Sequence, residues 1–392
     1  MSIKRIFIFL IAGLSLTTGP VGAEILAMVN YESKRLETPK GVTLFGMKAR
    51  REGIAIMDVD PKSPRFGKIL VDIPLNPEWE AHHIFYDKSM RKAYVVFLRN
   101  SQLGVIEMDQ FPYRMDLVDL PQCAFAEDIS FSDDNQTWYV TCMDGDKVVV
   151  GDAATDRVTA TIKTAAPYPH GFAINNRIDR ALATSTINAT DMSKAGEALT
   201  VIQPSTNEVL GTVKVSDKES PSGVAPVEVL FVPASEPATA YVANMYGGTL
   251  WALTWRAQSK TFEPRPVFDF GERGFNVPLE IYFNDKGDRL FVTTAKPGHL
   301  HIFDLSEGLL QPKLLHSIPA AEGAHHVAFT KDWRYAFVQN SLLNLEGMRD
   351  GEITVVDLTS QEVVARIDTL KKQDLLPNSI VLLPQWNHLA GH

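Results

Sequence analysis

Residues 323–340 read GAHHVAFTKDWRYAFVQN and contain the unit from which the chain is built. Two histidines, His325 and His326, open an alternating apolar stretch that runs to Phe329. Polar residues follow, and a second alternating stretch ends at Val338 before the polar pair QN. Alternation with a period of two on both sides of a polar turn predicts a β-hairpin.

The same unit recurs along the chain, and its last copy is only partial. The copies begin with HHIFY, EDISF, HGFAI, VEVLF, LEIYF, HHVAF and NSIVL, at positions 82, 127, 170, 227, 279, 325 and 378. The large apolar residue of each copy returns about every 43 to 57 residues, which is the period of a four-stranded propeller blade. The sequence therefore predicts an all-β fold, a seven-bladed β-propeller.

The two ends of the chain complement each other in this scheme. Residues 25–30, 53–59 and 68–74 are predicted strands that lack a first strand of the repeat type. The copy at 379–383 lacks the strands that should follow it. We expect the N-terminal strands and the C-terminal strand to form one blade, because this closes the ring and removes exposed sheet edges.

The second half of a blade also has a recognisable pattern. Residues 138–162 read WYVTCMDGDKVVVGDAATDRVTATI, which resembles the YVTN-type propeller repeat of exported bacterial proteins. Residues 351–367 resemble the second half of that repeat. The resemblance implies the fold and leaves the function open, because such propellers include redox-enzyme subunits, cofactor-handling proteins and binding scaffolds.

The N-terminus has the pattern of a secretory signal peptide. Lys4 and Arg5 precede an apolar run, and small residues lead to Ala23. We expect residues 1–23 to be removed and residues 24–392 to form a single propeller domain. The run is short for a membrane anchor, so we expect a periplasmic or secreted protein without membrane insertion after signal cleavage.

The charge balance argues against two classes of partner. The chain carries 38 basic and 47 acidic residues, a formal net charge of −9, and has no basic run. Nucleic acids and anionic membranes attract basic surfaces, so we expect neither as a partner. A small molecule or an exported partner protein remains.

Histidine is concentrated at the two positions that open each copy. Only 10 of the 392 residues are histidine, yet five of them occupy these positions. First strands line the channel of a propeller, so the openings should converge on one volume at the channel mouth. Because successive side chains of a strand point to opposite sides, we expect only one histidine of each pair to face the centre. The predicted metal ligands are His82, His83, His170, His325, His326 and Glu127.

Other polar residues should lie on the same rim. Some belong to the strand openings and others to the ends of second strands, and they are Asp128, Glu228, Glu280, Arg99, Asn244 and Asn340. The asparagines could orient a ligand. They could equally cap turns, which is the more common use of asparagine and the one that we favour.

Imidazoles and carboxylates that converge on one volume suit a transition metal, with copper preferred and zinc second. The paired histidines resemble those of copper-binding propellers, although no diagnostic motif of such an enzyme is present. The first hypothesis is an exported, metal-dependent oxidoreductase of small molecules. The second is a non-catalytic scaffold that binds a protein or cofactor, with a polar, water-filled channel. A non-covalently bound quinone or haem leaves no motif and stays open.

Cys123 and Cys142 are the two cysteines of the chain. They lie at neighbouring ends of one predicted hairpin, near the channel mouth. In an exported protein this arrangement favours a disulfide. A metal–thiolate role, with Met143 as a soft neighbour, and two buried thiols are the alternatives.

Overall fold

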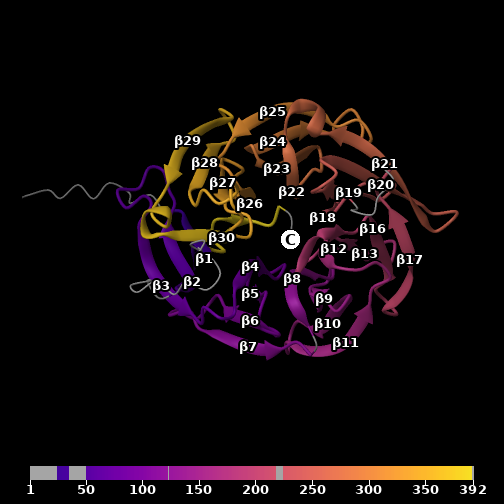
Figure 1. The fold of residues 1–392 in the computed structure, drawn as a ribbon, viewed down its shortest axis with the longest axis horizontal. Coiled ribbons are helices and arrows are strands. Elements are labelled where there is room, and N and C mark those ends of the chain that lie inside the picture. Colours follow the sequence, from indigo (N-terminus) through magenta and orange to yellow (C-terminus); the bar gives the residue numbers. More distant parts are fainter. Residues whose placement is uncertain (1–23, 35–49, 122, 218–223, 391–392) are drawn as a thin grey trace, which may run out of the picture.

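The structure, a computed structural model, describes residues 24–34, 50–121, 123–217 and 224–390. Figure 1 shows seven antiparallel sheets arranged in a ring around a central axis. Six of them have four strands, and the seventh has a short fifth strand. The predicted all-β fold and the predicted number of blades are confirmed. The expected signal peptide, residues 1–23, lies outside the described residues.

The four strands of each blade run from the axis outward. The innermost strands are β4 (Ala81–Tyr86), β8 (Ala124–Phe131), β12 (Pro169–Asn175), β18 (Pro226–Phe231), β22 (Asn276–Phe283), β26 (Ala324–Thr330) and β30 (Leu375–Leu382). The second strands are β5 (Lys92–Phe97), β9 (Thr137–Asp144), β13 (Arg180–Ser185), β19 (Thr239–Asn244), β23 (Arg289–Lys296), β27 (Tyr335–Asn340) and β1 (Leu26–Ser33).

The two outer positions follow in the same order. The third strands are β6 (Gln102–Glu107), β10 (Lys147–Asp152), β16 (Ala198–Gln203), β20 (Thr249–Arg256), β24 (Gly298–Asp304), β28 (Ile353–Asp357) and β2 (Glu52–Asp58). The outermost strands are β7 (Met115–Asp119), β11 (Arg157–Lys163), β17 (Glu208–Lys214), β21 (Thr261–Asp269), β25 (Lys313–Pro319), β29 (Glu362–Ile367) and β3 (Ile69–Leu75).

Burial follows this radial order. Inner strands such as β4 and β26 are buried along their whole length, and outer strands such as β11 and β29 alternate between exposed and covered residues. The apolar cores lie between neighbouring blades. In one of them Phe329 of β26 contacts Phe291 and Tyr282 of the preceding blade, with ring centroids 5.1 and 5.3 Å apart. Each blade therefore depends on its two neighbours for burial.

The ring closes as the sequence predicts. β30 from the C-terminal part pairs antiparallel with β1, and Ala27 lies opposite Leu382 in a sheet with the order β3-β2-β1-β30. The next blade is tied to this one, because the Tyr86 hydroxyl donates a hydrogen bond to the carbonyl oxygen of Leu382 at 2.9 Å. This bond between blades joins residues 296 positions apart in the sequence.

Several short elements were not predicted. β31 (Asn387–His388) adds to the inner edge of β26, and the Phe283 amide donates to the carbonyl of Ala390 at 2.9 Å. This tail therefore crosses the finishing ends of β26 and β22. A small hairpin, β14 (Ile187–Asn188) and β15 (Asp191–Ala195), is inserted between β13 and β16. Two short 3-10 helices span Gly271–Arg273 and Lys371–Gln373.

In the described part of the chain, no helix has the length and apolar character needed to cross a membrane.

Candidate metal centre

The opening positions of the innermost strands form β-bulges. Between the pairs Ala81–Phe97 and Ile84–Val95 of β4 and β5, two residues of β4 face one residue of β5. The pairing of every other innermost strand shifts in the same region. A bulge interrupts the alternation of side chains, so two successive residues can share one side of a strand.

Both histidines of each pair therefore belong to the same cluster. The rings of His82 and His83 stack with centroids 3.8 Å apart, and those of His325 and His326 lie 4.1 Å apart. The prediction that only one member of each pair faces the centre is wrong, because it assumed a regular strand. Regular pairing resumes one residue after each histidine pair.

The backbone just before each bulge is in the left-handed region. Six innermost strands have such a residue two positions before the opening pair, with φ between 51° and 89°, namely Glu80, Phe125, Tyr168, Ala225, Val277 and Gly323. Of these residues, glycine alone adopts this conformation without strain, and each of the others costs about 1–2 kcal/mol. A left-handed residue at one place in six blades, strained in five of them, indicates that the openings are held in position for a purpose.

Polar side chains of the second strands fill the bulges and connect successive blades. Thr141 accepts a hydrogen bond from the Asp128 amide at 3.0 Å and donates to the carbonyl of His170 in the next blade. Gln339 accepts from the His326 amide at 3.1 Å and donates to the next blade at Pro377. Each of these residues therefore fixes the backbone of two opening positions at once.

Thr184 acts in the same way, and Asn30 holds one opening position. Thr184 accepts from the Gly171 amide at 2.8 Å and donates to the carbonyl of Val227 at 3.0 Å. Asn30 donates to the carbonyl of His82 at 2.7 Å. The sequence analysis missed the threonines. The sequence nevertheless shows a pattern that could have identified them. In several second strands one polar residue follows two residues that are mostly apolar, as in YVT, LAT, FVT and FVQ.

One carboxylate organises the first half of the cluster. Oε2 of Glu127 lies 3.2 Å from Nε2 of His82 and 3.6 Å from Nε2 of His170. Nδ1 of His83 lies 3.0 Å from the Glu127 carbonyl oxygen. Because a carbonyl can only accept, Nδ1 of His83 carries the proton and Nε2 has the free lone pair. Within the described residues, Nε2 of His83 has no hydrogen-bond partner.

A second carboxylate organises the other half. Glu280 lies 3.2 Å from Nε2 of His325 through one oxygen and 3.7 Å from Nδ1 of His326 through the other. The His83 ring connects the two halves, with its centroid 4.3 Å from that of His326, 5.8 Å from His325 and 6.1 Å from His170. His83 is therefore central to the cluster.

These contacts bring potential ligand atoms within reach of one ion. One donor atom from each of His83, His325 and His326 lies within 4.8 Å of the others, and the same holds for His82, His83 and Glu127. Metal–nitrogen bonds are about 2.0–2.1 Å, so two ligands of one ion lie at most about 4.2 Å apart. Small rotations of the side chains would complete either group.

The cluster is buried, and burial controls its protonation. The five histidines of the cluster and Glu127 are at most 7 % exposed. Burial, with neighbouring imidazoles, lowers the pKa of His83 well below its ordinary value. Burial also lowers the pKa of His170, although Glu127 and Glu280 oppose this shift. Both rings are neutral at pH 7, as metal coordination requires.

The predicted rim residues divide into two groups. Asp128 accepts a hydrogen bond from the Phe172 amide at 2.7 Å, within the ring of strand openings. Burial, followed by Glu280 and Asp128, raises the pKa of Glu228 well above its ordinary value. Arg99 pairs with Glu80 at 2.9 Å, beside the cluster.

Asn244 and Asn340 are not in the cluster. Asn244 donates to the carbonyl of Val215 at 2.9 Å, and Asn340 donates to the carbonyl of Glu352 at 2.8 Å. Both side chains hold backbone at the ends of second strands, which is the structural role favoured by the sequence analysis.

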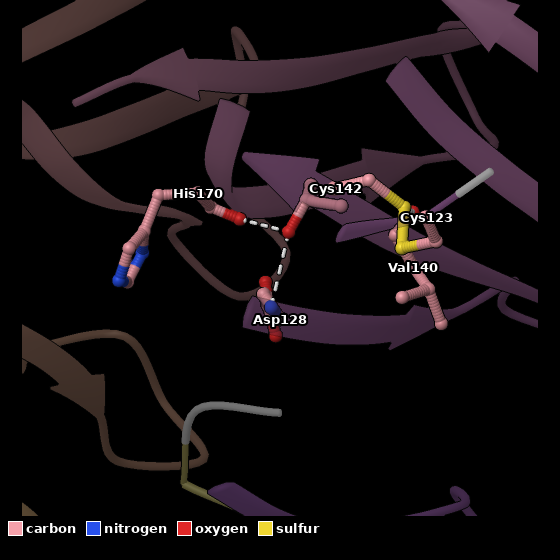
Figure 2. Close-up of a disulfide and its surroundings, with 6 residues drawn as sticks. Cys123, Asp128, Val140, Cys142 and His170 are labelled. Atoms are coloured by element: carbon pink, nitrogen blue, oxygen red, sulfur yellow. Dashed lines mark hydrogen bonds between the residues drawn. A yellow bond between two sulfur atoms is a disulfide. The ribbon is translucent and has the colours of Figure 1, made fainter. Parts of the chain in front are cut away.

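Cys123 and Cys142 form a disulfide, with their Cα atoms 5.2 Å apart. The bond joins the segment before β8 to the end of β9 (Figure 2). Figure 2 also shows that the ring of His170 points away from the two sulfurs. With both sulfurs in one bond, the disulfide replaces the metal–thiolate alternative. It braces the hairpin that holds Glu127, Asp128 and the backbone of His170.

Comparisons with known proteins support the fold alone. No protein-family model matches the chain, and no curated protein matches it. A hypothetical selenium-binding protein from Sulfolobus tokodaii is similar in structure, with a TM-score of 0.71, 12 % identity, and coverage of 94 % of this chain and 95 % of that chain. A functionally unknown protein from Desulfotomaculum acetoxidans has a TM-score of 0.60 and 17 % identity, covering 88 % and 95 %. Hydrazine synthase from Kuenenia stuttgartiensis has a TM-score of 0.56 and 12 % identity, covering 79 % and 92 %.

Proposed function

We propose that this propeller binds one transition-metal ion, copper, among its paired histidines and uses it in redox chemistry on a small molecule. The observation that carries the proposal is the group His83, His325 and His326, whose donor atoms lie within 4.8 Å of one another in a buried site. His82, His170 and Glu127 are the neighbouring donors. Imidazole rings that neighbouring carboxylates orient are suitable ligands for such an ion.

Copper is preferred to zinc because of the donor set. Imidazole suits both ions, but copper binds such ligands more tightly than zinc does. When bound, copper would supply one-electron redox chemistry. The chain's own residues would orient the rings through Glu127 and Glu280 and exclude water by burial.

The similar structures add modest support. One is a hypothetical selenium-binding protein and another is hydrazine synthase. We infer that propellers of this shape can support the chemistry of soft elements or of redox substrates, and we extend this to the present chain only as part of the proposal. We also infer that the repeats are of the YVTN type.

We infer that the protein is exported to a periplasm or secreted. The Cys123–Cys142 disulfide supports this inference, because such bonds persist in oxidising compartments. A secretory signal in residues 1–23 would agree with it. The expected partner is a small molecule or another exported protein, and the acidic balance of the chain argues against nucleic acid.

The test is metal analysis of protein purified without an affinity tag and loaded in turn with copper and zinc. We expect close to one copper per chain and an electron paramagnetic resonance spectrum with nitrogen hyperfine structure. His83→Ala should abolish this binding. His316→Ala is the matched control, because His316 lies exposed on β25, away from the cluster.

Two results would contradict the proposal. One is wild-type protein that retains no metal, and the other is equal copper binding by wild type and His83→Ala. The second hypothesis would then remain, in which the protein is a non-catalytic scaffold that binds a protein or cofactor.

A further inference from the structure

The histidine cluster contains two groups of donor atoms that overlap in one residue. His83, His325 and His326 form the first group, which we call the imidazole position. His82, His83 and Glu127 form the second group, which we call the carboxylate position. Within each group the donor atoms lie within 4.8 Å of one another, so each group can surround one ion after small side-chain rotations.

His83 allows only one of these positions to be filled at a time. Its Nδ1 donates to the carbonyl oxygen of Glu127 at 3.0 Å, so only Nε2 has a lone pair for an ion. That Nε2 is buried and has no hydrogen-bond partner among the described residues. One lone pair binds one ion, so the two groups are alternative positions of a single ion.

The carboxylate position already contains one well-spaced pair of ligand atoms. Nε2 of His82 and Oε2 of Glu127 lie 3.2 Å apart. Two ligands that each lie about 2.0 Å from one ion, at a tetrahedral angle, are about 3.3 Å apart. Oε2 of Glu127 is buried and accepts no hydrogen bond from the described residues. An ion bound to this pair would therefore have a negatively charged ligand in direct contact.

The imidazole position has a different set of ligands. Glu280 lies 3.2 Å from Nε2 of His325 and 3.7 Å from Nδ1 of His326, so the opposite nitrogens of these rings are the donors to an ion. Nδ1 of His325 has no hydrogen-bond partner within the described residues. Glu280 is in neither of the two donor groups, so it acts on this position through the rings. The ligands themselves are three uncharged imidazoles.

This difference in ligand charge separates the two oxidation states of copper. Cu(II) has one more positive charge than Cu(I), and in a buried site a carboxylate in direct contact stabilises that charge best. Mixed nitrogen and oxygen ligands are typical of Cu(II). Cu(I) is softer and binds well to uncharged imidazoles alone. The carboxylate position therefore suits Cu(II), and the imidazole position suits Cu(I).

The two positions also border different hollows. His82 and Glu127 line a pocket of about 220 Å³, which has room for a small molecule. His326 borders a separate hollow of about 50 Å³, which is bounded by residues 387–390 of the C-terminal tail and holds a few water molecules at most. A small molecule would therefore meet the ion at the carboxylate position.

We propose that one copper ion occupies the carboxylate position as Cu(II) and the imidazole position as Cu(I), with His83 as a ligand in both. The inference rests on the proposed function, since it requires copper in the cluster. It also assigns the pocket, because the small molecule of the proposed function then meets the oxidised ion beside His82 and Glu127.

The test compares the ligands of the two oxidation states in one sample. Ascorbate donates one electron to each Cu(II) and so converts the copper-loaded protein to the Cu(I) form. X-ray absorption counts the imidazole ligands in each state, and electron paramagnetic resonance counts the nitrogens on Cu(II). We expect two imidazoles on Cu(II) and three on Cu(I). Competition with nitrilotriacetate measures the affinity for Cu(II), and competition with bicinchoninate measures the affinity for Cu(I).

Two variants separate the positions. Glu127→Gln keeps the size of the side chain and the backbone carbonyl that holds His83, so it should weaken Cu(II) binding about tenfold or more and change Cu(I) binding less than about threefold. His325→Ala should have the reverse effect. The matched controls are Glu263→Gln and His316→Ala at exposed positions of the outermost strands, and they should change neither affinity.

This inference and the proposed function can fail separately. The same number of imidazoles on Cu(II) and Cu(I), or equal losses of both affinities in Glu127→Gln, would overturn the two positions even if one copper binds per chain. Protein that retains no copper in either state would contradict the proposed function and this inference with it. If a variant does not fold, the wild-type ligand counts decide the matter by themselves.

Discussion

The two ends of the innermost strands differ in backbone pairing and in the polarity of their side chains. At their starts, bulges, left-handed residues and buried histidines and carboxylates replace regular pairing. At their finishes, the same strands pair regularly and carry large apolar side chains such as Tyr86, Phe131 and Phe329. The finishing ends supply cohesion between blades. The starting ends keep desolvated polar groups that lower stability, which indicates retention for function.

The largest effect should come from opening the ring. Deletion of residues 378–392 removes most of the strand that completes the β1 sheet and exposes the edge of β1. We expect a severe loss of soluble yield and of the cooperative thermal transition, measured by calorimetry. Deletion of residues 387–392 is the control, because it removes only β31 and the tail and should have a smaller effect. An unchanged melting temperature in the longer deletion would contradict closure.

A matched pair of substitutions compares the two ends within one ring. Phe329→Ala at a finishing end should lower the free energy of unfolding by about 3–5 kcal/mol, because it leaves a cavity between blades. His83→Ala at a starting end should lower it by no more than about 1 kcal/mol in metal-free protein, because relief of desolvation offsets the lost packing. Urea denaturation measures both. Equal losses would mean that the histidine cluster is ordinary core.

The disulfide is the covalent support of the starting end. Replacing Cys123 and Cys142 by serine should lower the free energy of unfolding by roughly 3 kcal/mol, given the 19-residue separation. Because Thr141 is next to Cys142 and holds the His170 carbonyl, copper affinity should also fall. Denaturation and copper titration measure the two effects. Two free thiols in unreduced, denatured wild-type protein would remove the basis of this prediction.

The smallest predicted effect concerns pH. Burial raises the pKa of Glu52 to about 7 from an ordinary 4.5, with Glu32 adding to the shift. The folded state therefore keeps a proton that the unfolded state releases. The stability from this residue is complete below about pH 4.5 and is lost as the pH rises through 7.

Glu52→Gln keeps the shape without the charge, so it should raise the free energy of unfolding by roughly 2 kcal/mol at pH 8 and change little at pH 4.5. Urea denaturation at both pH values checks this. The residue belongs to the acidic starting end, and Glu263→Gln on β21 serves as the neutral comparison. A gain that is equal at both pH values would show that charge is not its cause.

Much of the fold could be predicted from the sequence because it is repetitive. Alternation and turn residues define hairpins locally, and their recurrence at one period predicts blades, since a blade buries its faces only against another blade. The strands within residues 25–74 lack a first strand, and the strand at 379–383 lacks the strands that should follow it. Together the two sets predict the closure. The histidines could be named as candidates because repeat-equivalent positions converge on the axis.

The detail of the site depends on tertiary structure. Alternation predicted that His82 and His83 would diverge, whereas a bulge brings their rings to 3.8 Å. Only the neighbouring blade shows why, because Thr141 and Gln339 bind backbone groups of two blades at once. The pocket beside His82 and Glu127 is likewise lined by the β14–β15 hairpin and the β27–β28 connection, which carry no repeat signal. Sequence periodicity determines where a residue sits in its own blade, and contacts between blades decide which donors share a volume and how much water reaches them.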